Sequence, residues 1–134
     1  MKFEKSCGAV VYKKENGEYL FLIEHMAQGH TSIPKGHVEN DETEEQTALR
    51  EIKEETNLEA KLDTNFRHKI TYSPFEGIMK DVIFFVAEAN SEKLINQECE
   101  VSSLEWMNFD DAVNAVTFDT DKETLKLAFE YLNK

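Results

Sequence analysis

The sequence predicts a layered domain in which strands and helices alternate, either α/β or α+β in class. Apolar stretches typical of strands are interleaved with stretches whose capping signals and apolar spacing are typical of helices. The length of 134 residues suits one domain over residues 1–134, and a hydrophobic content of 40% is enough for a buried core. No repeat, low-complexity tract or Pro/Gly-rich linker divides the chain.

The N-terminal part predicts a hairpin followed by a loop. Phe3–Tyr12 is dense in small and β-branched residues, and Tyr19–Glu24 is a second apolar run. Between these two strands lies Asn16-Gly17, a pair that suits a tight turn with positive φ angles. Ala27–Glu42 contains glycine and proline and is expected to form a loop.

A helix is predicted from Thr43 to Thr56. Thr43 and Gln46 have the spacing of a capping box, and good helix formers follow them. With about 100° per residue, Glu51, Glu54 and Glu55 fall within an arc of roughly 100°. The other side carries the residues expected to face a core, which are Ala48, Leu49, Ile52 and Thr56.

The second half predicts further strands and two helices. Leu58–Tyr72 reads as one or two strands, and a loop over Ser73–Gly77 follows. Asp81–Ala89 is the most apolar run and suits a central strand buried on both faces. The remaining elements are a short strand at Leu104–Met107, a weak helix at Asp110–Val116, and a final helix opened by a Thr120–Glu123 capping box, with Leu125, Ala128, Phe129 and Leu132 on one face.

Charge and composition exclude several classes of function. The net charge of −12 disfavours a broad electrostatic hold on DNA or RNA, although carboxylates can bind phosphates through bridging metal ions. Cys7 and Cys99 are too few and too far apart for a disulfide framework. We find no apolar signal segment and no run long enough to span a bilayer, so a reducing cytoplasm is the expected location.

The segment from Gly36 to Leu58 carries the chemistry that the sequence suggests. Three carboxylates on one helical stripe repel one another unless a cation neutralises them, and Mg²⁺ or Mn²⁺ prefers such oxygen ligands. Arg50 is placed to pair with Glu51 or Glu54 and to orient it. A solvated acidic helix face is the alternative, but it leaves the spacing of Gly36, Glu42 and Arg50 unexplained.

These residues closely resemble the Nudix box, G-x5-E-x7-R-E-U-x-E-E-x-G-U, where U is a bulky aliphatic residue. The matching positions are Gly36, Glu42, Arg50, Glu51, Ile52, Glu54, Glu55 and Leu58. Asn57 replaces the second glycine of the pattern, and asparagine is the next most tolerant residue for a left-handed helix end. The resemblance implies an α/β/α sandwich with a mixed sheet, and a metal-dependent enzyme that hydrolyses a phosphate–phosphate bond with Mg²⁺ or Mn²⁺.

The resemblance also implies roles for individual residues. Glu51, Glu54 and Glu55 are expected to bind metal together with the Gly36 carbonyl, and Glu51 or another carboxylate serves as general base. Arg50 would orient these groups, and Glu42 would support either the junction between loop and helix or an outer metal shell. A further carboxylate from a distant loop is frequent in the family, and its expected position is Glu100, with Glu98 as the second choice.

Beyond the box, three stretches resemble the asymmetrical diadenosine tetraphosphate hydrolases. They are His30–Glu39, Lys80–Ala87 and Thr117–Phe118–Asp119. By that likeness Lys35 and Lys80 would contact the polyphosphate, Tyr72 would line or stack in the nucleotide pocket, and His30 is a weaker candidate for substrate binding. Thr31 departs from relatives that often have an aromatic residue there.

The leading hypothesis is therefore hydrolysis of a dinucleoside polyphosphate, chiefly diadenosine tetraphosphate to ATP and AMP. A broader Nudix pyrophosphohydrolase acting on nucleoside triphosphates or RNA 5′ ends is the rival within the same class. A non-catalytic module that senses a nucleotide is the alternative of another class. We expect a small nucleotide as the partner, with no DNA and no membrane. The sequence leaves monomer and homodimer open.

Overall fold

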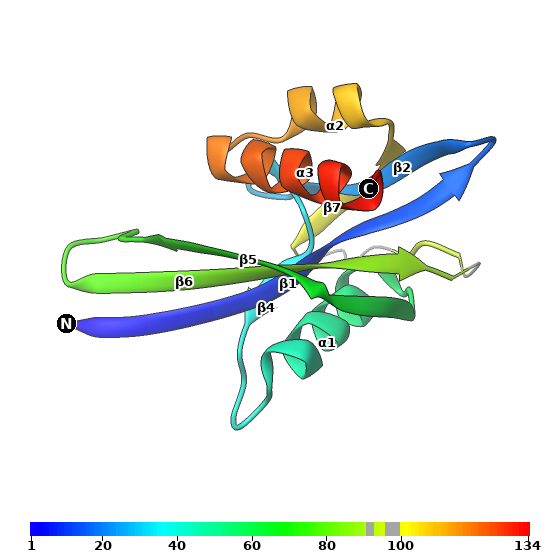
Figure 1. The fold of residues 1–134 in the computed structure, drawn as a ribbon. Helices are drawn as coiled ribbons and strands as arrows, with labels where there is room; N and C mark the ends of the chain where they lie inside the picture. The colour runs from blue at the N-terminus through cyan, green and yellow to red at the C-terminus, as the bar shows by residue number, and fades with distance from the viewer. Residues whose placement is uncertain (91–92, 96–99) are drawn as a thin grey trace.

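The computed structural model describes residues 1–90, 93–95 and 100–134. A twisted mixed β-sheet forms the middle layer, with helix α1 (Glu44–Thr56) on one face and helices α2 (Phe109–Ala115) and α3 (Asp119–Leu132) on the other (Figure 1). The strands follow the order β3 (Thr31–Ser32), β2 (Glu18–Met26), β1 (Lys2–Glu15), β6 (Ile78–Ala89), β5 (Ala60–Tyr72), while β4 (Lys35–His37) pairs with β1 and β7 (Val101–Met107) pairs with β2. The predicted layered α/β class, with a mixed sheet between helices, is confirmed.

The elements alternate along the chain much as the sequence suggested. The strands are β1 (Lys2–Glu15), β2 (Glu18–Met26), β3 (Thr31–Ser32), β4 (Lys35–His37), β5 (Ala60–Tyr72), β6 (Ile78–Ala89) and β7 (Val101–Met107). The helices are α1 (Glu44–Thr56), α2 (Phe109–Ala115) and α3 (Asp119–Leu132).

Strands β1 and β6 run parallel through the middle of the sheet, with Cys7 beside Ile83 and Val10 beside Val86. The β1–β2 hairpin turns at Asn16 and Gly17, whose φ angles of 52° and 79° are both positive, as predicted for this pair. Because β1 also pairs with β4, the segment that leads into α1 is anchored to the centre of the sheet.

Two hydrophobic clusters lie on opposite faces of the sheet. One contains Phe21, Phe84 and Leu125 and packs beneath α2 and α3, and the other contains Leu22, Ile52 and Phe85 and packs beneath α1. Residues 82–87 of β6 are all buried and alternate between the two clusters. The prediction of a central strand buried on both faces is confirmed.

Several local predictions need correction. The Thr120–Glu123 capping box is wrong, because α3 already begins at Asp119 after Phe118, which makes no side-chain cap hydrogen bond. Leu49 is 40% exposed and does not join the core with the other apolar residues of α1. The expected loop Ala27–Glu42 contains the short strands β3 and β4, which pair with β2 and β1.

The β5 region forms a single strand that begins at Ala60, with a register shift between Asp63 and His68. The apolar face expected on the last helix is present, since Leu125 and Ala128 are buried and Phe129 and Leu132 pack against them.

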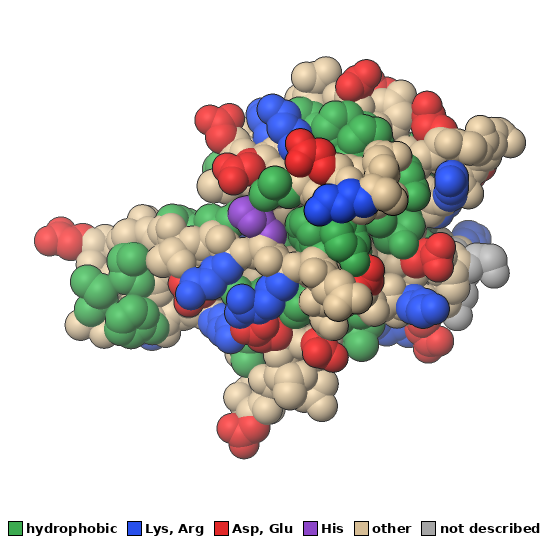
Figure 2. Space-filling model, viewed as in Figure 1, with side chains coloured by type: hydrophobic (Ala, Val, Ile, Leu, Met, Phe, Trp, Pro, Cys, Tyr) green, Lys and Arg blue, Asp and Glu red, His purple; other side chains and the backbone are tan. Residues whose placement is uncertain are grey.

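Two surface features complete the description. Figure 2 shows acidic side chains scattered over the face in view, and a hydrophobic patch where the sheet ends near the N-terminus and the β5–β6 connection. Met1, Phe3 and Phe75 are among the exposed large hydrophobic residues.

Within the described part of the chain, every helix is too short or too polar to cross a membrane. Cys7 is a buried free cysteine, whereas Cys99 lies outside the described residues.

Candidate active site

Helix α1 is closed at both ends by residues that the sequence singled out. The Thr43 hydroxyl accepts from Gln46 N at 3.1 Å, and the Gln46 side chain accepts from Thr43 N at 2.9 Å, so the predicted capping box is confirmed. At the other end Asn57 has a left-handed backbone with φ 71°, and its N–H donates to Lys53 O. Asparagine therefore provides the left-handed helix end that the glycine of the pattern would provide, and its Nδ2 also donates to Lys93 O at 2.9 Å.

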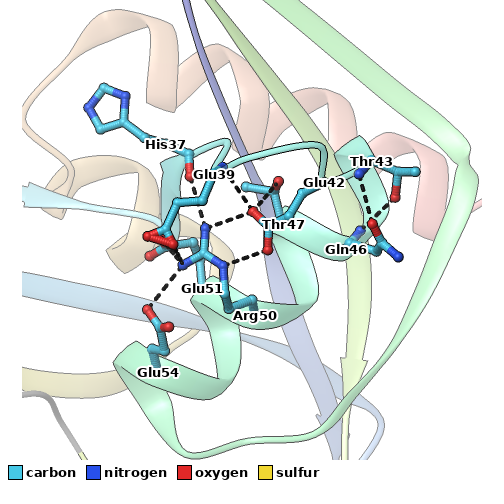
Figure 3. A network of polar contacts seen from close by, with 9 residues as sticks. All are labelled: His37, Glu39, Glu42, Thr43, Gln46, Thr47, Arg50, Glu51 and Glu54. Atoms are coloured by element: carbon cyan, nitrogen blue, oxygen red, sulfur yellow. Dashed lines mark hydrogen bonds and ion pairs between the residues drawn. The ribbon is translucent and has the colours of Figure 1, made fainter.

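Arg50 is the hub of a polar network that spans the loop and the helix (Figure 3). Its guanidinium donates to both carboxylate oxygens of Glu42, at 2.7 and 3.0 Å, and to Glu51 Oε1 at 2.7 Å. It also donates to Glu54 Oε2 at 3.2 Å and to the His37 carbonyl at 2.9 Å. Because one rigid fork serves all these acceptors, Arg50 couples the loop after β4 to two carboxylates of α1.

Glu42 belongs to the scaffold of the site. Besides Arg50 it accepts from the Thr47 hydroxyl and from Glu39 N, both at 3.0 Å. These hydrogen bonds, that from Arg50 above all, lower the pKa of Glu42 from its usual 4.5 to about 2. Glu42 therefore stays ionised and supports the loop–helix junction, as the sequence suggested.

Gly36 allows the Glu51 carboxylate to lie directly against the β4 backbone. A Cβ atom at position 36 would overlap the Glu51 carboxyl group, well inside van der Waals contact. The φ angle of Gly36 is outside the left-handed region, so close approach rather than backbone freedom explains the glycine. Gly36 pairs with Cys7 of β1, and this pairing sets the distance between the central sheet and α1.

A cleft of about 520 Å³ brings together most of the predicted site residues. Its lining includes Lys35, Gly36, Arg50, Glu51, Glu54, Glu55, Lys80 and Glu100. Glu100, the expected loop carboxylate, lines this cleft, and its role as a metal ligand stays a prediction. Glu98, the second choice, lies outside the described residues. Lys35 and Lys80 line the same cleft as these carboxylates. Burial lowers the pKa of Lys80, and the charge of neighbouring Lys35 lowers it further.

The structure adds Glu24, a residue that the sequence analysis did not assign. Glu24 on β2 and Glu55 on α1 are both almost fully buried and lie against each other. Burial is the main cause that raises the pKa of each carboxyl, and mutual repulsion raises that of Glu55 further. A glutamate directly after the apolar run Leu20–Ile23 is the signal that could have identified this residue.

A second cavity of about 430 Å³ adjoins the first, and Lys35 lines both. Its walls are largely apolar and are formed by Ile70, Tyr72, Val82, Phe84 and Phe118, together with Asp119, Thr120 and Asp121. Tyr72 therefore lies in a different cavity from the carboxylates. His30 lines neither cavity, but its ring lies 5.7 Å from that of Phe118, so it supports the rim.

The donor set of the acidic cleft suits a hard divalent cation. Its candidate ligands are carboxylate and carbonyl oxygens, which Mg²⁺ and Mn²⁺ prefer. Glu55 Oε1 is buried and has no hydrogen-bond partner among the described residues, so it is available as a ligand. Among the described residues, no three acidic, histidine or cysteine side chains are already arranged around one point. Arg50 holds Glu51 and Glu54, which would have to turn toward an ion.

Comparison with known proteins agrees with this geometry. Residues 2–128 match the family described as NUDIX domain. The asymmetrical bis(5′-nucleosyl)-tetraphosphatase of Mus musculus is 30% identical over 142 residues, covering 96% of this chain and 95% of the mouse protein. The Caenorhabditis elegans protein of the same name is 30% identical over 118 residues, covering 85% of this chain and 86% of its own.

A solved structure is similar over the same extent. The crystal structure of a C. elegans Ap4A hydrolase binary complex matches with a TM-score of 0.88 and 26% identity, covering 97% of this chain and 98% of that one. The family match spans nearly the whole chain and includes the helix that carries the glutamates. The chain therefore belongs to the NUDIX family and is a Nudix hydrolase.

Proposed function

We propose that this enzyme hydrolyses a phosphate–phosphate bond in a dinucleoside polyphosphate, with diadenosine tetraphosphate cleaved to ATP and AMP as the reference reaction. One observation carries the proposal: a cleft of carboxylates and lysines meets an aromatic cavity at Lys35. The first suits a metal-bound polyphosphate and the second suits a base. The names of the mouse and nematode relatives support the same substrate class.

Glu51, Glu54 and Glu55 would hold Mg²⁺ or Mn²⁺, with the Gly36 carbonyl and Glu100 as further oxygen ligands. When bound, such an ion neutralises charge on the phosphate oxygens and lowers the pKa of a coordinated water. All five residues line the same cleft. In this structure Arg50 holds Glu51 and Glu54 through hydrogen bonds at 2.7 and 3.2 Å, and both carboxylates would turn from Arg50 toward a bound ion.

A glutamate of this cleft takes the proton of the attacking water while the water oxygen bonds to phosphorus and the bridging P–O bond breaks. Glu51 is the better placed base, in place of a role as metal ligand, since its side chain is only 13% exposed and lies between Gly36 and Arg50. Burial is the main cause that raises the pKa of Glu51, which makes it a stronger base than an exposed glutamate. Glu54 is more exposed and accepts a longer bond from Arg50, so it is the second choice.

Lys35 and Lys80 would bind the phosphate chain between the two cavities. A polyphosphate needs point cations beyond its metals, and both ammonium groups border the acidic cleft. Burial lowers the pKa of Lys80, and a bound phosphate would reverse that shift. Tyr72, with Phe118 across the cavity, would then offer the base an aromatic face.

The names of the mouse and nematode relatives favour a dinucleotide over a nucleoside triphosphate, which one aromatic cavity would serve equally well. An RNA 5′-end enzyme has to hold a long anionic chain, which a net charge of −12 disfavours. A module that binds a nucleotide without hydrolysing it does not require the intact carboxylates around Arg50. We further propose a cytoplasmic location and either a monomer or a homodimer, to be resolved by fractionation and by light scattering.

The test is an assay of the purified protein with Mg²⁺ against diadenosine tetraphosphate, GTP, dGTP and capped RNA. We expect ATP and AMP as the dominant products, and loss of activity in EDTA. Glu54→Gln should lower kcat by two orders of magnitude or more, as removal of a metal ligand does. Glu45→Gln, an exposed site on the same helix, is the matched control. Faster cleavage of GTP than of any dinucleotide would refute the substrate class, and full activity of Glu54→Gln would refute the metal site.

A further inference from the structure

Asp121 is a buried acid in the aromatic cavity, and the proposed chemistry does not use it. It lies in the first turn of α3 and is only 5% exposed, and it lines the cavity beside Tyr72, Phe118 and Lys35. None of the residues that the structure describes donates a hydrogen bond to its carboxyl group. Lys35 is the one cation in the cavity lining, and its charge favours the ionised form against the burial that raises the pKa of Asp121.

Helix stability alone does not explain a buried acid at this position. Acidic residues in the first turn of a helix interact well with its dipole, and Asp119 in the same turn already does so from an exposed position. Removing a second carboxylate from most of its hydration without giving it donors is costly, because little of the lost hydration is replaced. A ligand that brings its own N–H donors into the cavity would remove this cost.

The hydrogen-bonding edge of a nucleotide base determines whether that base can supply such N–H donors. A base stacked on Tyr72 or Phe118 would direct one edge toward the wall of the cavity, where Asp121 lies. An ionised carboxylate is an acceptor only. Guanine presents two parallel donors, N1–H and the N2 amino group, which match its two oxygens. Adenine presents one donor beside the N1 acceptor, so its N1 would face a carboxylate oxygen.

We propose that Asp121 makes this cavity selective for guanine, by accepting hydrogen bonds from N1–H and the N2 amino group. The inference rests on the proposed function and specifies the nucleoside at that same site. The enzyme then cleaves dinucleoside tetraphosphates that contain guanosine more efficiently than diadenosine tetraphosphate. A bidentate pair between a side chain and a base edge typically supplies a discrimination of roughly tenfold or more.

The test compares kcat/KM for diguanosine and diadenosine tetraphosphate, measured in one competitive reaction with Mg²⁺. The wild type should favour the guanosine substrate by about tenfold. Asp121→Asn should invert the preference, because an amide offers one donor and one acceptor and so matches adenine. Asp121→Ala should bring the ratio close to one. Both variants also remove a negative charge near the polyphosphate, but that effect is common to the two substrates and cancels in the ratio.

Asp110→Asn is the matched control, because it makes the same change in the first turn of α2, outside this cavity. It should leave the ratio unchanged, and thermal unfolding should show that all variants are folded. A purely structural role of Asp121 would lower stability and leave the ratio unaltered. Cleavage of both dinucleotides with equal kcat/KM, or a wild-type preference for adenine, would overturn this inference alone. Cleavage of neither would overturn the proposed function as well.

Discussion

Replacing Gly36 with alanine should separate catalysis from stability. The new Cβ would overlap the Glu51 carboxyl group, which is the far end of a flexible side chain and can move away. The φ angle of Gly36 is open to alanine, so we expect the free energy of unfolding to change by less than about 1 kcal/mol. To clear the methyl group, the carboxylate must shift by about 1 Å or more, and a displacement of that size can cost about 100-fold in rate.

The shift should also break the 2.7 Å hydrogen bond from Arg50 to Glu51. We therefore expect kcat for diadenosine tetraphosphate, followed by chromatography of ATP and AMP, to fall by about 100-fold or more while the Tm stays nearly constant. Gly17→Ala is the reciprocal control, since its φ of 79° makes alanine strained by roughly 1 kcal/mol far from the site. It should lower Tm and spare kcat. A Gly36→Ala enzyme with unchanged kcat would refute the close-approach argument.

Three further predictions concern protons and the aromatic cavity. Burial raises the pKa of Glu24 and Glu55 above the usual 4.5, so the stability that these carboxyl groups contribute in their protonated form is lost as pH rises. The Tm of the metal-free protein, measured by calorimetry, should therefore fall from pH 5 to pH 8. Mn²⁺ should raise the Tm more at pH 8 than at pH 5, because it binds the ionised carboxylates. Glu42, with its pKa lowered to about 2, loses its contribution only below pH 4.5 and does not affect that range. Glu24→Gln removes the repulsion that raises the pKa of Glu55, so Mn²⁺ should bind to this variant at lower pH than to the wild type in calorimetric titrations. An unchanged pH dependence of Mn²⁺ binding would contradict the contact between Glu24 and Glu55. Phe118→Ala removes a 52% exposed ring and should raise KM for dinucleotides several-fold with little change in Tm, whereas an unchanged KM would exclude base stacking there.

Local patterns predicted the parts of the protein that depend on neighbours in the chain. The Thr43–Gln46 box, the Asn16-Gly17 turn and the buried run of β6 each follow from backbone geometry and side-chain type over a few residues. The Thr120–Glu123 capping box was a wrong prediction, because α3 begins at Asp119, one residue before Thr120, although Thr120 carries a good capping side chain. Leu49 was also misplaced, because its side of α1 extends past the edge of the cluster that α1 covers.

The residue set of the Nudix box could be identified from the sequence alone, because its residue types and spacings are local, and the resemblance to the family already indicated a Nudix hydrolase. The arrangement of that set is a property of the tertiary structure. Only packing brings Glu24 of β2 against Glu55 of α1, and only the pairing of β4 with β1 places Gly36 against Glu51.

The substrate depends still more on contacts between distant segments. Tyr72 and Phe118 lie 46 residues apart in the chain and reach one cavity because the end of β5, an edge strand of the sheet, and the start of α3 line it together. Asp121 is an ordinary acidic residue in a helix turn until that packing removes it from water. The sequence by itself determined the family and with it the class of hydrolase. The tertiary structure decided which carboxylates are buried and which of them share a cavity with aromatic rings, because burial and proximity arise only when separate segments pack together.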